Sequence, residues 1–447
     1  MASSLAAQVK GPVFASYDDG YADEAAAWNR ATTHTPALAV GATSADDVAA
    51  AVRYAADHGL HVSVQGTGHG AEVAVTSGLM ITTRRLDRLS IDVAAKTATL
   101  GAGLEWGTVV AAAAEHGLAP ITGAAPTVGV AGFLVGGGLG PLARSHGFSS
   151  DYVESFTVVT GAGEIVEANS TDHSDLFWAL RGGKFGLGVV TEVRIRLVDL
   201  ATLYGGSLMF EEGDIETALR AWVDYTATAD PRVTTSAAIV RFPPFDEVPP
   251  ALRGRTLLSI RFAYPGRADE GAGFAAPLRS AAPVYLDVLG EMPAADIAKI
   301  HNDPTEPAPS QAYGMLLGDI DQEFATAFLT TFGAGVDSAF VAAELRHLGA
   351  ATRRDVEGGS AVAGRSGSFT CALIGVRPDL FEKVMPAEVA DWKELASRWL
   401  LSENNPNLMG LPMTADRLAT MWPEPANTRL GEIRWRYDPD SVLAKPA

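Results

Sequence analysis

Cysteine and long apolar runs are both scarce in this chain. Cys371 is the one cysteine among 447 residues, so a disulfide within the chain and a zinc site built from several cysteines are excluded. Its apolar neighbours predict a buried strand thiol. No uncharged run approaches the ~18 apolar residues of a membrane span, and the first twenty residues lack the apolar core of a signal peptide. We therefore expect a soluble, cytoplasmic protein with no membrane partner.

Basic residues are outnumbered by acidic ones. The chain has 34 Lys and Arg against 53 Asp and Glu, a formal net charge of −19. Such a charge repels phosphate backbones, so we expect no nucleic-acid partner. A length of 447 residues exceeds what one hydrophobic core usually supports, which predicts two domains or more.

Two kinds of local pattern divide the chain. Before about residue 200, helical and strand patterns mix without a regular βαβ period, which favours an α+β fold over a doubly wound one. Predicted helices there cover 44–60, starting at Ser44, 105–117, and a short segment capped by Asp172; predicted strands cover 61–65, 79–83, 89–92, 97–101, 189–198 and a hairpin within 153–168. From about residue 202, strands predicted at 236–241, 257–264, 340–346 and 368–376 suggest an antiparallel sheet with helices on one side. The segment 430–443 predicts a helix that ends at Asp438 and packs back on the first half.

Two glycine-rich runs are the most informative local feature. The first, "VQGTGHG" (64–70), places His69 between glycines; the second spans 128–147 and contains "GLGPLA", a weak match to a dinucleotide-binding pattern. Both runs expose backbone N–H groups, as binding of a pyrophosphate requires, although tight turns alone would also explain either run. No second ligand stands near His69, so we expect no metal site, and no G-x-S-x-G elbow supports hydrolysis.

Four motifs together resemble one family. "VQGTGHG", "VGVAGFLVGGGLGPLARSHGFSSD", "LFWALRGGKFGLGVVTEV" and "LGEIRWRYDPDSVL" are similar to the RxGGH turn, the second flavin loop, the LFWAxRGxGxxFGxVT segment and the LxxIKxxYDPxNxF segment of the FAD-linked oxidases of the vanillyl-alcohol oxidase type, berberine-bridge-enzyme-like branch. The resemblance implies FAD bonded covalently through His69. It also implies a set of cofactor-binding residues: Gln65, Gly66, Thr67, Gly68, Gly70, Thr127, Val128, Gly129, Gly132, Gly136, Gly137, Gly138, Gly140 and Val189.

Two departures from the family pattern narrow the expected chemistry. Many relatives add a second flavin bond from a cysteine in GxCxxVG, where this chain has Ala125, so attachment is expected through His69 only. The tyrosine of the family's YxN motif corresponds to Asn405, which cannot accept a proton as a phenolate can. Asn407 remains as a predicted catalytic hydrogen-bonding group, and Asn405 is expected to contact substrate.

The strand pattern of "FVAAELRHLGA" suggests further site residues. A period of two places Glu344 and Arg346 on one face, where a carboxylate and a guanidinium could line a cavity. Some relatives use a carboxylate at the place of Glu344, so we expect it to be catalytic and Arg346 to bind substrate; a surface ion pair is the alternative. Trp106, Trp178 and Trp435 are expected in the core.

The resemblance also implies an architecture: a two-part FAD-binding domain (1–200, joined by 401–447) and a substrate domain (201–400) with a large antiparallel sheet covered by helices. The expected activity is hydride transfer from a small, aromatic or polyketide-like natural product to flavin N5, with dioxygen as acceptor. Two alternatives stay open: an amine or alkaloid oxidase, and a flavin-fold binding protein without turnover. The pattern does not indicate an oligomeric state.

Overall fold

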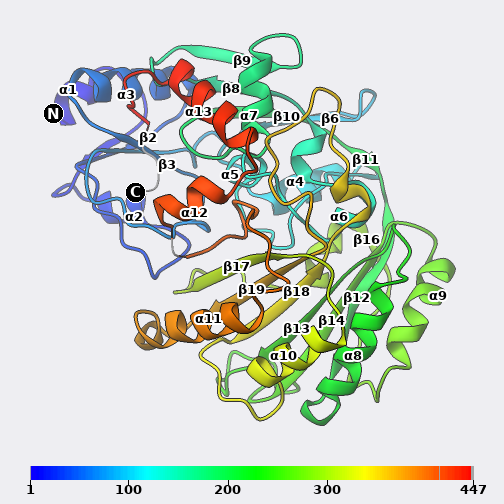
Figure 1. The fold of residues 1–447 in the computed structure, drawn as a ribbon. Coiled ribbons are helices and arrows are strands. Elements are labelled where there is room, and N and C mark those ends of the chain that lie inside the picture. Colours follow the sequence, from blue (N-terminus) through cyan, green and yellow to red (C-terminus); the bar gives the residue numbers. More distant parts are fainter. Residues whose placement is uncertain (1, 412, 444–447) are drawn as a thin grey trace.

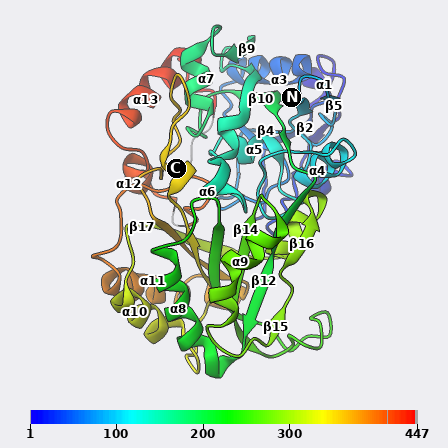
Figure 2. The ribbon, with the colours of Figure 1, turned by 90° about the vertical axis from the view of Figure 1, so that its right-hand side faces the viewer.

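A computed structural model describes residues 2–411 and 413–443. The chain folds into two halves that are stacked one above the other (Figures 1 and 2). The first half and the C-terminal helices lie at the top of Figure 1, and one large sheet with its helices lies at the bottom. This is an α+β arrangement, as the mixed patterns predicted. The exact boundaries at residues 200 and 400 stay a prediction.

Two sheets form the first half. The smaller has strand order β1-β2-β4-β3, in which β4 pairs in parallel with both β2 and β3. The larger is antiparallel, with order β5-β6-β10-β8-β9. The strands are β1 (Val13–Ala15), β2 (Leu38–Gly41), β3 (Val62–Gln65), β4 (Leu79–Thr82), β5 (Leu89–Asp92), β6 (Thr97–Gly101), β8 (Val153–Val159), β9 (Ile165–Asn169) and β10 (Val189–Arg196), with the short pair β7 (Leu118–Ala119) and β11 (Val198–Asp199).

Helices connect and cover these sheets. The link from β2 to β3 is α3, whose N-terminus is capped by the Ser44 hydroxyl accepting from the Asp47 backbone N–H at 3.2 Å. The helices of this half are α1 (Ala2–Ala6), α2 (Tyr21–Ala25), α3 (Ala45–Asp57), α4 (Trp106–Ala114), α5 (Val130–Leu134), α6 (Ala143–His146), α7 (Ser174–Leu180), α12 (Ala415–Thr420) and α13 (Ala426–Tyr437), with the 3₁₀ turn η1 (Ser149–Tyr152). As predicted, the C-terminal helix α13 returns to the first half, where it lies beside α7 (Figure 1).

The second half is built on one antiparallel sheet of order β15-β12-β14-β13-β18-β19-β17, with β16 on β12. Its strands are β12 (Thr202–Phe210), β13 (Thr234–Arg241), β14 (Thr256–Tyr264), β15 (Leu286–Asp287), β16 (Gly290–Pro293), β17 (Gln311–Leu317), β18 (Ala342–His347) and β19 (Phe369–Gly375). Its helices are α8 (Ile215–Thr226), α9 (Ala268–Arg279), α10 (Gln322–Phe332) and α11 (Val384–Leu395), with 3₁₀ turns η2 (Glu212–Asp214), η3 (Ala294–Ile300), η4 (Ala350–Arg353) and η5 (Pro378–Leu380).

The strands of this sheet have an apolar and a polar face. Ile260, Leu345 and Cys371 belong to the core that α8, α10 and α11 cover. Since side chains alternate along a strand, their neighbours Arg261, Glu344 and Thr370 lie on the opposite face. That face is directed toward the first half of the chain, and a buried polar surface therefore lies between the two halves.

Two local predictions are wrong. Asp172 does not cap α7: the N-cap is His173, in a left-handed conformation and without a side-chain cap, while Asn169 engages Asp172. Trp435 is 72 % exposed, because it lies on the outer side of α13, whereas Trp106 and Trp178 are buried as expected. Among the described residues, none of the helices is long and apolar enough to cross a membrane.

Candidate functional site

The His69 turn follows directly after β3. Gly68 adopts a left-handed backbone (φ +80°), and a Cβ there would come within 2.6 Å of the Ala27 Cα. Glycine at 68 therefore serves the close packing of the turn against the segment after α2. The Trp28 N–H donates to the Thr67 carbonyl at 2.9 Å, which fixes the same approach.

The imidazole of His69 is held on two sides. It stacks on the Trp28 ring with centroids 4.1 Å apart, and its Nε2 lies 2.9 Å from the Thr127 hydroxyl. Burial lowers the pKa of His69 to about 4, although Thr127 and the charge of Asp303 oppose the shift. The ring is therefore neutral at physiological pH, the state in which an imidazole is a nucleophile.

The two glycine runs meet at this histidine. Besides the contact between His69 and Thr127, the Thr67 hydroxyl accepts from the Gly129 N–H at 3.3 Å. The two glycine runs, 64–70 and 128–147, thus lie together although they are about sixty residues apart in sequence, and we call them the cradle. This is the juxtaposition that a single long cofactor needs.

The glycines of the cradle fall into two groups. In the first, a Cβ would overlap protein atoms: at Gly136 those of the Asn407 side chain, at Gly138 the Phe133 ring, and at Gly140 the Thr122 carbonyl oxygen. These glycines allow the protein to pack against itself.

In the second group the space is open. No described atom lies within 4 Å of a Cβ built on Gly70 or Gly132, and Gly66 has neighbours only at 3.7 Å and beyond. Clearance for a ligand is therefore an explanation for these three positions and not for the whole run.

The remaining predicted cofactor residues line or support the same region. The Gln65 amide donates to the Ala26 carbonyl at 3.1 Å and so ties the end of β3 to the segment before Trp28. Val128 is partly buried next to Thr127, and Gly137 takes a positive φ of 96°. Val189 is buried at the start of β10 opposite Val159, in the core that also contains Val62 of β3.

Glu344 is the centre of a buried ion-pair cluster and not of a surface pair. Its carboxylate accepts from Arg261 at 2.8 Å and from Arg346 at 2.9 Å, and the His301 Nε2 lies 3.5 Å away. Burial would raise the pKa of Glu344, but Arg346 and Arg261 outweigh it and hold the pKa well below its usual range. The carboxylate is thus fixed in its ionised form, which suits orientation of the guanidinium groups better than proton transfer.

Asn405 and Asn407 lie against the second glycine run. The Asn407 amide donates to the Phe133 carbonyl at 2.7 Å, and its oxygen accepts from the Lys184 ammonium at 2.6 Å. The Asn405 oxygen accepts from the Asn407 N–H at 3.0 Å; its Nδ2 is buried without a hydrogen-bond partner among the described residues.

Two charged residues of the site were missed from the sequence. Burial raises the pKa of Glu72 to about 7 and lowers that of Lys184 to about 8, and each opposes the shift of the other. No spacing signal pointed to Glu72, three residues after His69. Lys184 carried a signal, because it stands where the quoted family pattern has a glycine.

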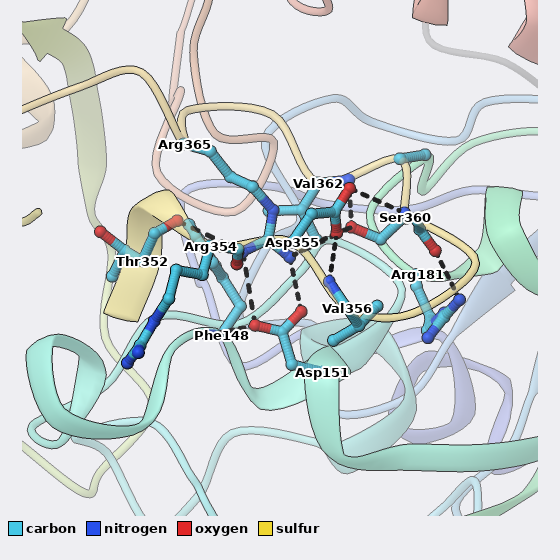
Figure 3. Close-up of polar contacts among 12 residues, drawn as sticks. Phe148, Asp151, Arg181, Thr352, Arg354, Asp355, Val356, Ser360, Val362 and Arg365 are labelled. Atoms are coloured by element: carbon cyan, nitrogen blue, oxygen red, sulfur yellow. Dashed lines mark hydrogen bonds and ion pairs between the residues drawn. The ribbon is translucent and has the colours of Figure 1, made fainter. Parts of the chain in front are cut away.

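Arg365 ties the two halves together (Figure 3). Its guanidinium pairs with Asp151 of η1 at 2.5 Å and with Asp355 at 3.2 Å, and it lies over the Phe148 ring at 4.9 Å. Burial raises the pKa of Asp151, and Arg365 offsets only part of this. Arg365 therefore holds the 354–365 loop on the segment that follows the second glycine run.

A segment of the second half packs on residues 29–30, beside the His69 turn. The Arg30 N–H donates to the Ala308 carbonyl at 3.0 Å, and the Ser310 N–H donates to the Asn29 side chain at 3.1 Å. Asp303 belongs to this segment and acts electrostatically on both His69 and Arg346. The histidine thus lies between the glycine cradle and the polar face of the large sheet.

The comparisons with known proteins agree with this geometry. Residues 36–169, which include the His69 turn and most of the second glycine run, match the FAD binding domain family. This part of the chain is therefore similar to FAD binding domains. Over 204 residues the chain is 37 % identical to (R)-6-hydroxynicotine oxidase of Paenarthrobacter nicotinovorans, a match that covers 45 % of this chain and 44 % of that oxidase.

Solved structures show that the fold extends over the whole chain. The structure of 6-hydroxy-D-nicotine oxidase from Arthrobacter nicotinovorans superposes with a TM-score of 0.83 over 99 % of this chain and 98 % of that one, at 22 % identity. BBE-like 1 of Physcomitrella patens superposes with a TM-score of 0.86 over 100 % and 98 %, at 17 % identity. The fold class and the family resemblance predicted from the motifs are confirmed.

Proposed function

We propose that this protein is an FAD-dependent oxidoreductase that holds its cofactor covalently through His69 only. It oxidises a small organic molecule, of an aromatic or polyketide-like kind, with dioxygen as acceptor. When bound, FAD supplies the hydride-accepting chemistry. The observation that carries the proposal is the neutral, oriented imidazole of His69 at the meeting point of the two glycine runs in an FAD binding domain.

The residues present fit such a cofactor. Open space beside Gly66, Gly70 and Gly132 gives room next to exposed backbone N–H groups, which is what a pyrophosphate and a ring system need. Ala125 cannot form a thioether, and Cys371 is buried in the core of the other half. We therefore expect that FAD is attached to the protein through one residue, His69.

His69 is prepared for bond formation by its surroundings. The Trp28 ring and the Thr127 hydroxyl fix the orientation of the imidazole, which lowers the entropic cost of attack. Burial keeps the ring unprotonated above a pKa of about 4, so no base is needed before attack at neutral pH.

The polar face of the sheet supplies the substrate-orienting groups. Arg346 binds substrate, and Glu344 holds the guanidinium in place through its bond at 2.9 Å. Asn407 offers an amide next to the second glycine run. Exclusion of water from this face strengthens each of these interactions.

Oxidation of an amine or alkaloid is the second candidate. Asn405 replaces the tyrosine of the family's YxN motif, and Glu344 is locked in ion pairs with Arg261 and Arg346. A neutral amine can lose hydride without prior deprotonation, so it needs neither group as a base. The similarity to (R)-6-hydroxynicotine oxidase supports this candidate.

Acid precipitation of the purified protein tests the attachment. The yellow flavin should stay with the precipitate and fluoresce with the protein band on a denaturing gel. His69→Ala should release any bound FAD into the supernatant, whereas His116→Ala, at an exposed position, should retain it. Release of flavin from the unaltered protein would refute covalent attachment.

Anaerobic addition of (R)-6-hydroxynicotine and of small phenolic alcohols separates the substrate candidates. Bleaching of the oxidised flavin band identifies a compound that is turned over. If the compounds shift the band and none of them bleaches it, a flavin-fold binding protein is favoured instead.

A further inference from the structure

Lys184 has a backbone conformation that is unusual for its residue type. It lies in the loop between α7 and β10 with φ +55°, a region that non-glycine residues rarely adopt because the side chain crowds the backbone. The family pattern quoted above has glycine at this position, where the conformation costs little. Strained non-glycine residues occur at functional sites and also in ordinary turns, as at Lys96, so the surroundings of Lys184 decide which explanation applies to it.

The ammonium of Lys184 is directed into the cradle. Its Nζ donates to the Asn407 oxygen at 2.6 Å, and Asn407 fills the space above Gly136 that a Cβ would occupy. Asn407 is itself fixed by its bond to the Phe133 carbonyl. The positive charge is thus held beside the second glycine run by a partner that has no charge of its own.

Glu72 is an acidic residue that lies just after the first glycine run, and its charge is opposite to that of Lys184. It follows His69 by three residues, and its Oε2 is buried without a hydrogen-bond partner among the described residues. Glu72 and Lys184 act on each other electrostatically, with pKa values of about 7 and about 8. The site therefore contains a carboxyl group that can carry a proton near neutral pH, under the electrostatic influence of a nearby cation.

We propose that Lys184 is the cation that promotes the reaction of the reduced flavin with dioxygen, and that Glu72 is the proton donor of that step. This inference rests on the proposed function. Negative charge develops on oxygen as it takes up electrons, and a fixed, partly buried ammonium stabilises that charge.

Dioxygen takes two electrons and one proton from the reduced, singly protonated anionic cofactor and a second proton from the Glu72 carboxyl group. The products are hydrogen peroxide, oxidised FAD and the Glu72 carboxylate. Glu72 then regains its proton from solvent, and Lys184 keeps its own.

Other groups that face the pair do not titrate in the same range. His69 is neutral above a pKa of about 4. Burial raises the pKa of Tyr313 on β17 above its ordinary value of 10.0, with a contribution from Glu72. Asp303 acts on His69 and Arg346 from the covering segment. The rate of the oxygen reaction should therefore fall as the pH rises through about 7 to 8, where Glu72 and then Lys184 lose their protons.

Stopped-flow reoxidation tests the proposal without a substrate. The holoprotein is photoreduced in the absence of air and mixed with oxygenated buffer. We expect Lys184→Gly to slow reoxidation on the order of tenfold or more, and Lys184→Arg to preserve most of the rate. Glu72→Gln should slow it and remove the pH dependence near 7.

Lys96→Gly is the matched control. Lys96 has φ +53° in the turn between β5 and β6, so this change also removes one lysine from a left-handed position, away from the cradle. It should leave reoxidation unchanged. Since glycine suits the backbone at both positions, slow reoxidation in Lys184→Gly cannot be assigned to misfolding.

Sulfite binding gives a readout that is independent of turnover. Addition of sulfite to oxidised flavin places negative charge on the ring, and a nearby cation favours it. Lys184→Gly should weaken sulfite binding on the order of tenfold, and Lys96→Gly should not. Unchanged reoxidation and sulfite binding in Lys184→Gly would overturn the proposal, whereas a purified protein without flavin would overturn the proposed function itself.

Discussion

Two glycine-to-alanine changes separate ligand clearance from protein packing in the cradle. Gly132 lies inside α5, and no described atom lies within 4 Å of a Cβ placed on it. Alanine in a helix interior is more stable than glycine by about 0.5–1 kcal/mol. Gly132→Ala should therefore raise the free energy of unfolding by about this amount if nothing but water occupies the space.

The same change should reduce the flavin content. The new methyl group would extend into the open side of the cradle, where we propose that the cofactor lies. Gly140→Ala should instead destabilise the protein, because the new Cβ would overlap the Thr122 carbonyl oxygen. A backbone atom cannot move aside cheaply, and we expect a loss of stability of about 1–3 kcal/mol or more.

Urea unfolding and the ratio of flavin to protein absorbance measure both effects. The expected pattern is a stable, flavin-poor Gly132→Ala protein and a destabilised Gly140→Ala protein. Full flavin content in Gly132→Ala, with the stability gain, would refute ligand clearance at this position and leave a helix-packing explanation.

Three further predictions concern charged and titrating groups. Glu344→Gln should lower the free energy of unfolding by about 3–5 kcal/mol, because it leaves Arg261 and Arg346 without a buried counter-charge. The pKa of Glu344 is depressed in the folded protein. The difference in unfolding free energy between the variant and the unaltered protein, measured in urea, should therefore be constant at pH 6–8 and shrink as the pH falls below about 4.5. A difference that persists undiminished at low pH would contradict this. Arg365→Met should destabilise the protein by about 3–5 kcal/mol at neutral pH by leaving Asp151 unpaired, and the double change with Asp151→Asn should recover much of the loss; additive losses would exclude the ion pair as the cause. The third prediction concerns the rate at which FAD becomes attached to protein that was produced without flavin, measured by the fluorescence of the denatured protein. This rate should be constant between pH 6 and 8, because His69 is neutral above a pKa of about 4. A rate that rises across this range would show that His69 must first lose a proton.

The sequence predicts the parts of the fold that depend on local patterns. The cap at Ser44, the strand that leads to His69, and the period of two around Glu344 are all visible as residue spacings, and the structure has them at these places. Asp172 failed as a cap because Asn169 accepts from its backbone N–H and so draws it into the preceding turn. Trp435 failed as a core residue because hydrophobic character alone does not decide which side of a helix is buried.

The site depends on contacts between distant segments, and these limit what a sequence can reveal. The motif resemblance led to His69 and to both glycine runs. It could not distinguish Gly132, which faces open space, from Gly140, which packs on a backbone carbonyl. Glu72 is unremarkable by spacing and acquires its raised pKa only through burial near Lys184.

Strand β3 connects the histidine to residues at the far end of the sequence. One edge of β3 pairs with β4, and at the other edge the Val62 N–H donates to the Val442 carbonyl at 2.8 Å, with a bridge from Val62 to Leu443. The strand that delivers His69 therefore gains its second neighbour only after residues 442–443 have been synthesised. A change that removes residues 442–443 would therefore leave one edge of β3 without its neighbour, directly before the turn that holds His69.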